Sequence, residues 1–305
     1  MAQNKTVLQP SNKNFFVFTL LLIAILGVSW GAFIGVSAGT LYLSIFLSSI
    51  GILVLTQLFV DSNDRKIMKE LFKSPFLQSP LLASTMWLFG FIAVILINVI
   101  GRGINQGFST LQFFSPLYLS AGGLGGGISQ SFSASAVENS EFMSWFYGVF
   151  VAGTIEEFAW AFTLPLAFWI VAIFLNQSVF NNRFGRNFYF MFSLTFSVLT
   201  FIGIHALNET YVGIMFIIAG IFRLLMNLSA YSLRLGIAFI IGVHQSNNNL
   251  AYIYQVGMAQ YIEMLFTNIY GIGLVLLFVA IVVYVFSNLG EITQEWRRER
   301  GGRGE

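Results

Sequence analysis

Cysteine is absent from the 305 residues of the chain, and charged side chains are scarce. Without cysteine the chain forms no disulfide, offers no thiolate nucleophile and supplies no cysteine ligand to a metal. Charged residues make up 9% of the sequence, whereas an average soluble domain has roughly 25%. A shortfall of this size indicates that most of the chain does not meet water. The formal net charge of +2 gives no basis for binding nucleic acid.

Hydrophobic residues, 56% of the chain, come in long blocks rather than in the strict alternation of a β-barrel. We therefore predict an all-α fold: a polytopic bundle of about eight transmembrane helices in one integral membrane domain, residues 1–305. The predicted spans lie near 15–36, 40–60, 81–101, 143–174, 188–206, 211–228, 232–246 and 266–287. The fourth is too long for one untilted crossing, and Pro165 inside it predicts a kink or a break into two shorter helices.

Basic residues set the expected orientation. Lys5 and Lys13 precede the first span, the loop Asp61–Lys73 is rich in lysine and arginine, and arginines gather in the charged tail 289–305. With eight crossings, the positive-inside rule places these segments and both termini in the cytoplasm, with the tail near anionic membrane lipid. If the fourth span were split into two crossings, the membrane orientation of every later helix and loop would be reversed. Residues 102–141, rich in Gly and Ser, lack the context of a phosphate-binding loop and are expected to form a flexible loop over the bundle, either on its outer side or re-entrant.

Ionisable side chains are expensive in a bilayer core, so those that occur there usually face the bundle interior with a partner. The chain has two histidines, His205 and His244, and one pair of acids inside a predicted span, Glu156 and Glu157. Adjacent helix positions point about 100° apart, so the two carboxylates do not face one cavity equally. A buried carboxylate suits general-base catalysis, whereas a purely structural interpretation pairs it with a neighbouring helix or with Arg223.

Asn248 lies one helical turn after His244 and shares its face of the helix. An imidazole and an amide in this relation can position a water molecule or hold a metal, with the amide fixing the orientation. Neutral imidazole together with carboxylate is also a set of ligands that suits Zn²⁺. The sequence indicates no other cofactor.

The embedded polar residues form three short motifs, each on its own hydrophobic span. They are Glu156-Glu157, Phe201 with His205, and His244 with Asn248. Their order resembles the CAAX-protease (CPBP/Abi) family, whose motifs read EExxxR, FxxxH and HxxxN on successive helices. The resemblance covers residues 143–250, a CPBP-like core. It departs at one position, because Ala161 stands where the family has the arginine that supports its acidic pair.

The resemblance implies glutamate-dependent proteolysis of a membrane-anchored peptide or protein, within the membrane. By position, Glu156 would activate the attacking water with Glu157 in support, and His205 would orient that water or stabilise the oxyanion. His244 and Asn248 would complete the polar pocket, with Asn248 as an oxyanion donor.

Two other classes of protein are compatible with the sequence. Ala161 favours a catalytically inactive relative that serves as a scaffold or interaction subunit for a membrane-protein partner. A transporter or channel is a third alternative, for which repeat symmetry or more embedded charge would be expected. No internal repeat is evident in the chain.

Overall fold

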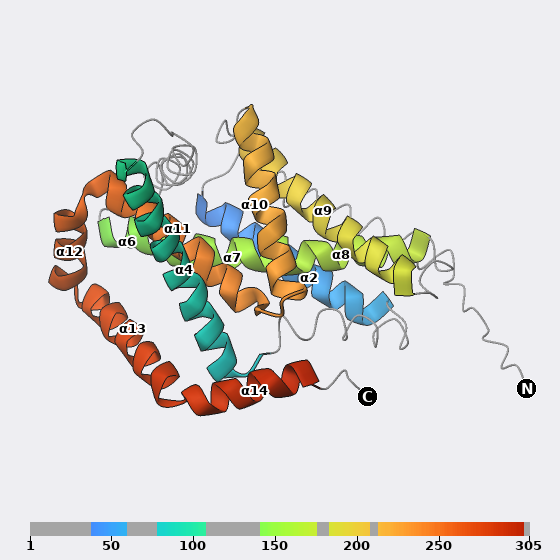
Figure 1. Cartoon of the computed structure of the whole chain (residues 1–305). Coiled ribbons are helices and arrows are strands. Elements are labelled where there is room, and N and C mark those ends of the chain that lie inside the picture. Colours follow the sequence, from blue (N-terminus) through green and yellow to red (C-terminus); the bar gives the residue numbers. More distant parts are fainter. Residues whose placement is uncertain (1–37, 60–77, 108–140, 176–182, 208–212, 302–305) are drawn as a thin grey trace, which may run out of the picture.

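The computed structural model describes residues 38–59, 78–107, 141–175, 183–207 and 213–301. Every regular element in these ranges is helical and none is a strand, so the fold of the described chain is all-α, as predicted. Figure 1 shows the arrangement of these helices. They are α2 (Ala38–Phe59), α4 (Pro80–Gly107), α9 (Arg183–Leu207), α10 (Ile214–Tyr231), α11 (Gly236–Val256), α12 (Met258–Thr267), α13 (Ile269–Ser287) and α14 (Leu289–Gly301), with one further helical run between α4 and α9.

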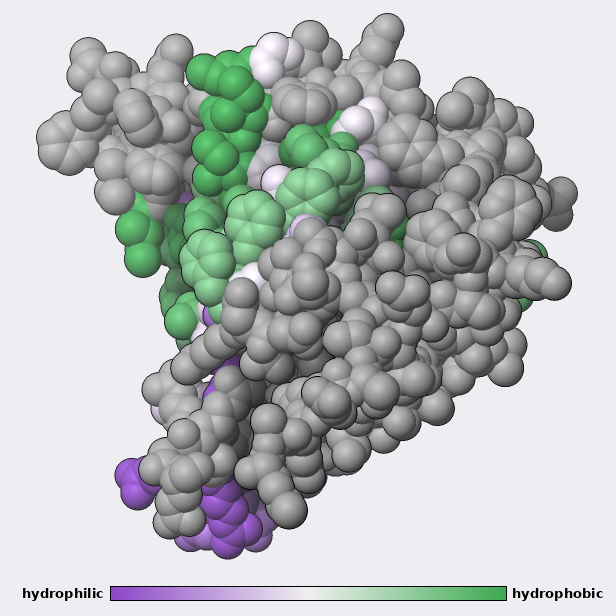
Figure 2. Space-filling view, turned by 90° about the vertical axis from the view of Figure 1, so that its right-hand side faces the viewer, coloured by the Kyte–Doolittle hydropathy of each residue, from purple (hydrophilic) through white to green (hydrophobic). Residues whose placement is uncertain are grey.

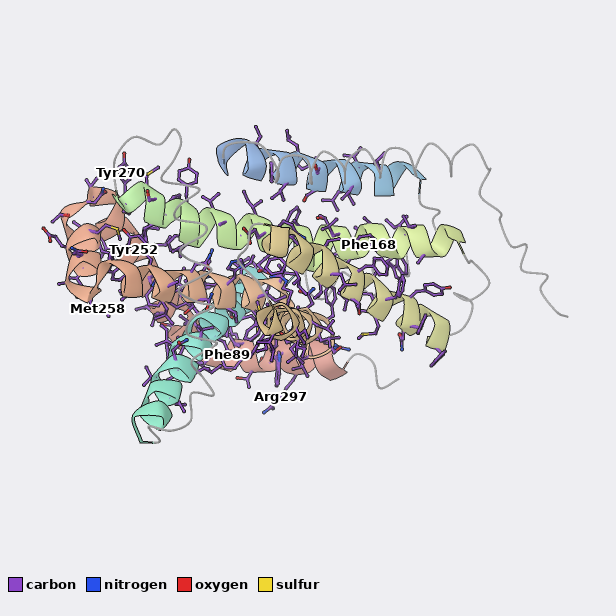
Figure 3. The ribbon with its side chains drawn as sticks, turned by 90° about the horizontal axis from the view of Figure 1, so that it is seen from above. Phe89, Phe168, Tyr252, Met258, Tyr270 and Arg297 are labelled. Atoms are coloured by element: carbon purple, nitrogen blue, oxygen red, sulfur yellow. The ribbon has the colours of Figure 1, made fainter. Side chains whose placement is uncertain are left out.

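The run from Glu141 to Leu175 is the central element of the molecule. It consists of α-helical pieces joined by two π-helical turns, η2 and η3. These are α6 (Glu141–Phe146), η2 (Tyr147–Val151), α7 (Ala152–Glu157), η3 (Phe158–Thr163) and α8 (Leu164–Leu175). Viewed from above, α2 lies alone on one side of this run, and α4, α9 and α11 lie on the other (Figure 3). Its apolar stretch is 78% buried, so it forms the core on which the other helices pack.

Of the two outcomes predicted for Pro165, a kink or a break, the break does not occur, because neighbouring helices replace the hydrogen bond that proline removes. A proline has no N–H, so the carbonyls of Trp160 and Ala161, its π- and α-helical acceptors, lose their usual donor. Ser197 Oγ on α9 donates to the Trp160 carbonyl, and Tyr231 Oη on α10 donates to the Ala161 carbonyl, each over 2.5 Å. Such substitute donors let a proline persist inside a membrane helix.

Among the described residues, three helices are long and apolar enough to cross a membrane: Pro80–Ile100, Phe142–Ala172 and Ile269–Ser287. Helices also occupy the other predicted ranges except 15–36, which lies outside the described residues. The number of crossings therefore stays a prediction.

Three boundaries differ from those predicted. The helix predicted over 232–246 continues to Val256, since its polar residues find partners on neighbouring helices. The predicted loop 102–141 begins later, because α4 continues to Gly107, and most of the loop lies outside the described residues, as does Asp61–Lys73. The charged tail is helical to Gly301, as α14.

Helices α4 and α11 approach each other closely through two glycines. A Cβ atom on Gly90 of α4 would overlap the carbonyl oxygen of Phe239, and one on Gly242 of α11 would overlap the carbonyl oxygen of Trp87. Small residues that let two backbones meet are typical of packed membrane helices. Beside this contact, Trp87 Nε1 donates to Gln245 Oε1 over 2.7 Å, which fixes the register of the two helices.

Candidate functional site

Glu157, on α7, is the centre of a buried charged cluster. Its side chain is fully buried, and its Oε1 atom lies 2.5 Å from Arg223 Nη1 and 2.6 Å from His244 Nδ1. Arg223 comes from α10 and His244 from α11, so one carboxylate oxygen joins three helices. The structural alternative raised from the sequence, a pairing of an acid with Arg223, therefore describes Glu157.

Glu156 contacts the same imidazole from the other side. Its Oε2 atom lies 3.8 Å from His244 Nε2, and its side chain is 5% exposed. Although the two acids point about 100° apart on the helix, the ring of His244 lies between them and faces both. The 3.8 Å separation is longer than a direct hydrogen bond, so the two groups are close without bonding to each other.

Arg223 is a member of the cluster that sequence reasoning named only as an alternative partner. Its side chain is buried, and its guanidinium carbon lies 4.7 Å from the centre of the Phe201 ring, an additional favourable contact. The sequence did carry a signal, because Arg223, Asn227 and Tyr231 recur every four residues on an otherwise apolar helix. This spacing places all three on one face, and all three contact the central run.

Asn248 makes a structural contact, and its predicted oxyanion role stays a prediction. Its Nδ2 atom donates to the carbonyl oxygen of Gly148 in the π-helical turn η2, over 2.9 Å. Its neighbours act in the same way: Gln245 donates to Thr154 Oγ1 at 3.0 Å, and Asn249 accepts from Trp145 Nε1 at 2.7 Å. The polar stretch of α11 therefore holds the central run in place by hydrogen bonds.

His205 lies in α9, one turn after Phe201, but its side chain falls outside the described residues. Its predicted role stays a prediction. Of the predicted site residues, Glu156, Glu157 and His244 come together, and Asn248 lies one turn further along α11. Within the described ranges, no group of three or more His, Asp or Glu is arranged to hold a metal ion.

A cavity of about 340 Å³ lies on the other side of α7. It is walled by apolar residues of α2, α7, η3 and α11, with Gln78 and Thr154 as polar groups. Glu156, Glu157 and His244 do not line it. The charged cluster itself is buried, because the side chains of Glu156, Glu157 and Arg223 are at most 5% exposed and that of His244 is 12% exposed.

The described residues define an all-helical protein with three helices suited to a membrane. No protein-family model, curated protein or solved structure matches the chain.

Proposed function

We propose that the chain crosses the membrane about eight times, with both termini in the cytoplasm. Contacts at one end of the bundle support an even number of membrane crossings from the start of α4 to the start of α11, and from the start of α4 to the end of α13. Gln78, before α4, donates to the carbonyl of Leu235, before α11, at 3.4 Å, and Leu81 at the start of α4 packs with Val285 at the end of α13. Single crossings by α4, 141–175, α9, α10 and α11, followed by α13, return the chain to that same end.

The charged cluster lies deep in such a membrane. His244 comes eight residues after the first residue of α11, which corresponds to about 12 Å along the helix axis. The hydrocarbon core is roughly 30 Å thick, so this depth is close to its middle. Ionisable groups at that depth usually mark a functional site.

We propose that this site belongs to an intramembrane endopeptidase of the CAAX-protease type. The observation that carries the proposal is the sequence of contacts Glu157–His244–Glu156. A carboxylate that binds one ring nitrogen of a histidine fixes the tautomer and leaves the other nitrogen to act on the reaction. Here Glu157 binds Nδ1, and Nε2 faces Glu156.

In this mechanism Glu156 is the general base, and a water molecule that enters beside Glu156 and His244 with the substrate is the nucleophile. Glu156 removes a proton from the water as the oxygen attacks the peptide carbonyl. His244 orients the water, and Glu157 with Arg223 holds the imidazole. The proton is then delivered to the departing amine. The family pattern adds His205 and Asn248 as groups that stabilise the oxyanion.

The test is a comparison of cells that express the wild-type protein or Glu156→Gln, with new peptide termini of membrane proteins identified by mass spectrometry. Loss of a general base lowers rates by about 10²–10⁴-fold, so termini that depend on the protein disappear in the variant. Glu263→Gln, at an exposed acid on α12, is the matched control and leaves processing unchanged. After extraction in detergent, the wild type, Glu156→Gln and Glu263→Gln must show the same helical content.

A second candidate function is a non-catalytic membrane subunit, and one observation favours it. The acids are buried, and the cavity beside α7 is lined by Thr154, Ile155 and Phe158 rather than by Glu156 or Glu157. In that case the charged cluster serves to join α7, α10 and α11. Absence of any terminus that depends on Glu156, together with normal folding of Glu156→Gln, would reject the protease and leave this candidate.

A further inference from the structure

The C-terminal helix α14 turns away from the preceding membrane helix. Helix α13 ends at Ser287, Asn288 takes a non-helical conformation, and α14 begins at Leu289. Figure 1 shows α14 running across the lower end of the bundle, beneath the ends of α4 and α13. The 19 residues of α13 span about 28 Å, close to the roughly 30 Å of the hydrocarbon core. Its end therefore marks the membrane boundary at which α14 lies.

One side of α14 is apolar, and only part of that side is covered by protein. Leu289, Ile292 and Trp296 are spaced three and four residues apart and share a face. Ile292 is 8% exposed and packs with Leu81 and Val285, whereas Leu289 is 51% exposed. Trp296 is partly buried, so Leu289 is the most exposed apolar residue of this face. Because Leu289 shares the face with Ile292, which packs on the ends of α4 and α13, it is directed toward the same side as those ends.

The opposite side of α14 is polar. Glu291, Gln294 and Arg298 follow the same three- and four-residue spacing on the reverse face, and all three are exposed. Arg297 lies between the two faces and extends away from the bundle (Figure 3). Figure 2 shows hydrophilic residues gathered at the lower end of the molecule, with a hydrophobic described surface above them.

Net charge does not attract this helix to the membrane. Residues 289–305 contain four glutamates and four arginines, so the segment has no net charge. A polybasic segment is drawn to anionic lipid at about 1 kcal/mol per basic residue, and here acids offset that attraction. The hydrophobic side of α14 remains as the feature that sets its position.

We propose that α14 lies flat in the phospholipid headgroup layer, with Leu289 and Trp296 in lipid and Gln294 and Arg298 in water. Its partner is the bilayer itself, and the contact is hydrophobic rather than charge-driven, as in amphipathic interfacial helices. Arg297, at the boundary of the two faces, extends its aliphatic stem over lipid and its guanidinium to the phosphates. The inference rests on the proposed membrane crossing of α13 but not on catalysis.

Because the chain lacks cysteine, single cysteines can be introduced for spin labels without removing native ones. The probes are Leu289→Cys, Trp296→Cys, Gln294→Cys and Arg298→Cys, with Ile292 left intact. In phosphatidylcholine vesicles, spin labels at positions 289 and 296 are expected to collide more often with oxygen, which dissolves in lipid, than with a water-soluble nickel complex. Labels at positions 294 and 298 are expected to show the opposite ratio. Equal, water-like accessibility at all four sites would overturn the proposal.

Two further measurements test separately whether α13 crosses the membrane and whether charge holds α14 at the bilayer. Leu276→Cys, at an exposed leucine of α13, reports lipid if α13 crosses the membrane; water at this site would reject the membrane crossing itself. Adding phosphatidylglycerol to the vesicles leaves the pattern on α14 unchanged. A lipid-facing pattern that appears only with phosphatidylglycerol would show that charge seats the helix, which contradicts the proposal.

Discussion

Arg223 Nη1 on α10 lies 2.5 Å from Glu157 Oε1 on α7, and both side chains are almost completely buried. The same carboxylate oxygen accepts from His244 on α11. A buried charge is tolerated only when its partner is present, because without the partner no electrostatic attraction offsets the free-energy cost of desolvating the charge. The pair therefore couples the position of α10 to that of the acid pair.

Arg223→Met is expected to lower the free energy of unfolding by about 3–5 kcal/mol, since it leaves the Glu157 carboxylate without its cation. Arg298→Met, at an exposed arginine of α14, is the control and should change stability little. Denaturant unfolding in detergent, followed by circular dichroism, measures both. The double variant Arg223→Met with Glu157→Gln should recover part of the loss, because the uncompensated charge is gone. Equal stability of the two single variants would contradict the role of the pair.

A second prediction concerns the carbonyl oxygen that Pro165 leaves without its helical donor. Tyr231→Phe removes the hydroxyl that donates to the Ala161 carbonyl while keeping the ring. A buried acceptor without a partner costs about 1–3 kcal/mol, so the free energy of unfolding should fall by that amount. Tyr284→Phe, at an exposed tyrosine of α13, should have almost no effect.

Pro165→Ala provides the internal control for this prediction, because alanine supplies the missing N–H. In the Pro165→Ala background, Tyr231→Phe should cost less than in the wild type, and the difference is measured by a double-mutant cycle. Identical costs in the two backgrounds would show that Tyr231 does not substitute for the proline.

The approximate positions of the described helices could be predicted from the sequence because long apolar runs without strict alternation favour helices. The behaviour of Pro165 could not, since it depends on donors from Ser197 and Tyr231, which lie on other helices. The partner of Glu157 could be named from the sequence only as one alternative. The family motif places an arginine four residues after this acid, whereas here the partner, Arg223, comes from a helix 66 residues further on.

Asn248 shows a different limit of sequence reasoning. Its spacing from His244 predicts a shared pocket, but the spacing alone could not show that its amide also donates to the Gly148 carbonyl in the π-helical turn η2. A π-helical turn has no clear sequence signature, so the carbonyls that it exposes are not visible before the structure. The helices α12 and α14 were missed because they are too short or too polar to resemble spans.

A third prediction concerns the close contact of α4 with α11. Gly90→Ala or Gly242→Ala places a methyl group on a backbone carbonyl of the facing helix, so the two helices must separate. Overpacking of this kind costs about 1–3 kcal/mol or more. Gly273→Ala on α13 is the matched control, because a Cβ there meets nothing within 4 Å. Thermal unfolding in detergent should show a clear drop for the first two and none for the control.

The last prediction concerns Ala161→Arg, which restores the arginine of the family motif. Ala161 is fully buried against Ala230 and Ile240, and Arg223 already occupies the Glu157 carboxylate. The added side chain has no room and no free partner, so we expect misfolding rather than a gain of activity. Size-exclusion chromatography in detergent should show loss of the monodisperse species. The decisive comparison adds Arg223→Met. If an arginine at position 161 reached Glu157, the double variant would regain wild-type stability, and that result would contradict the packing described for this helix.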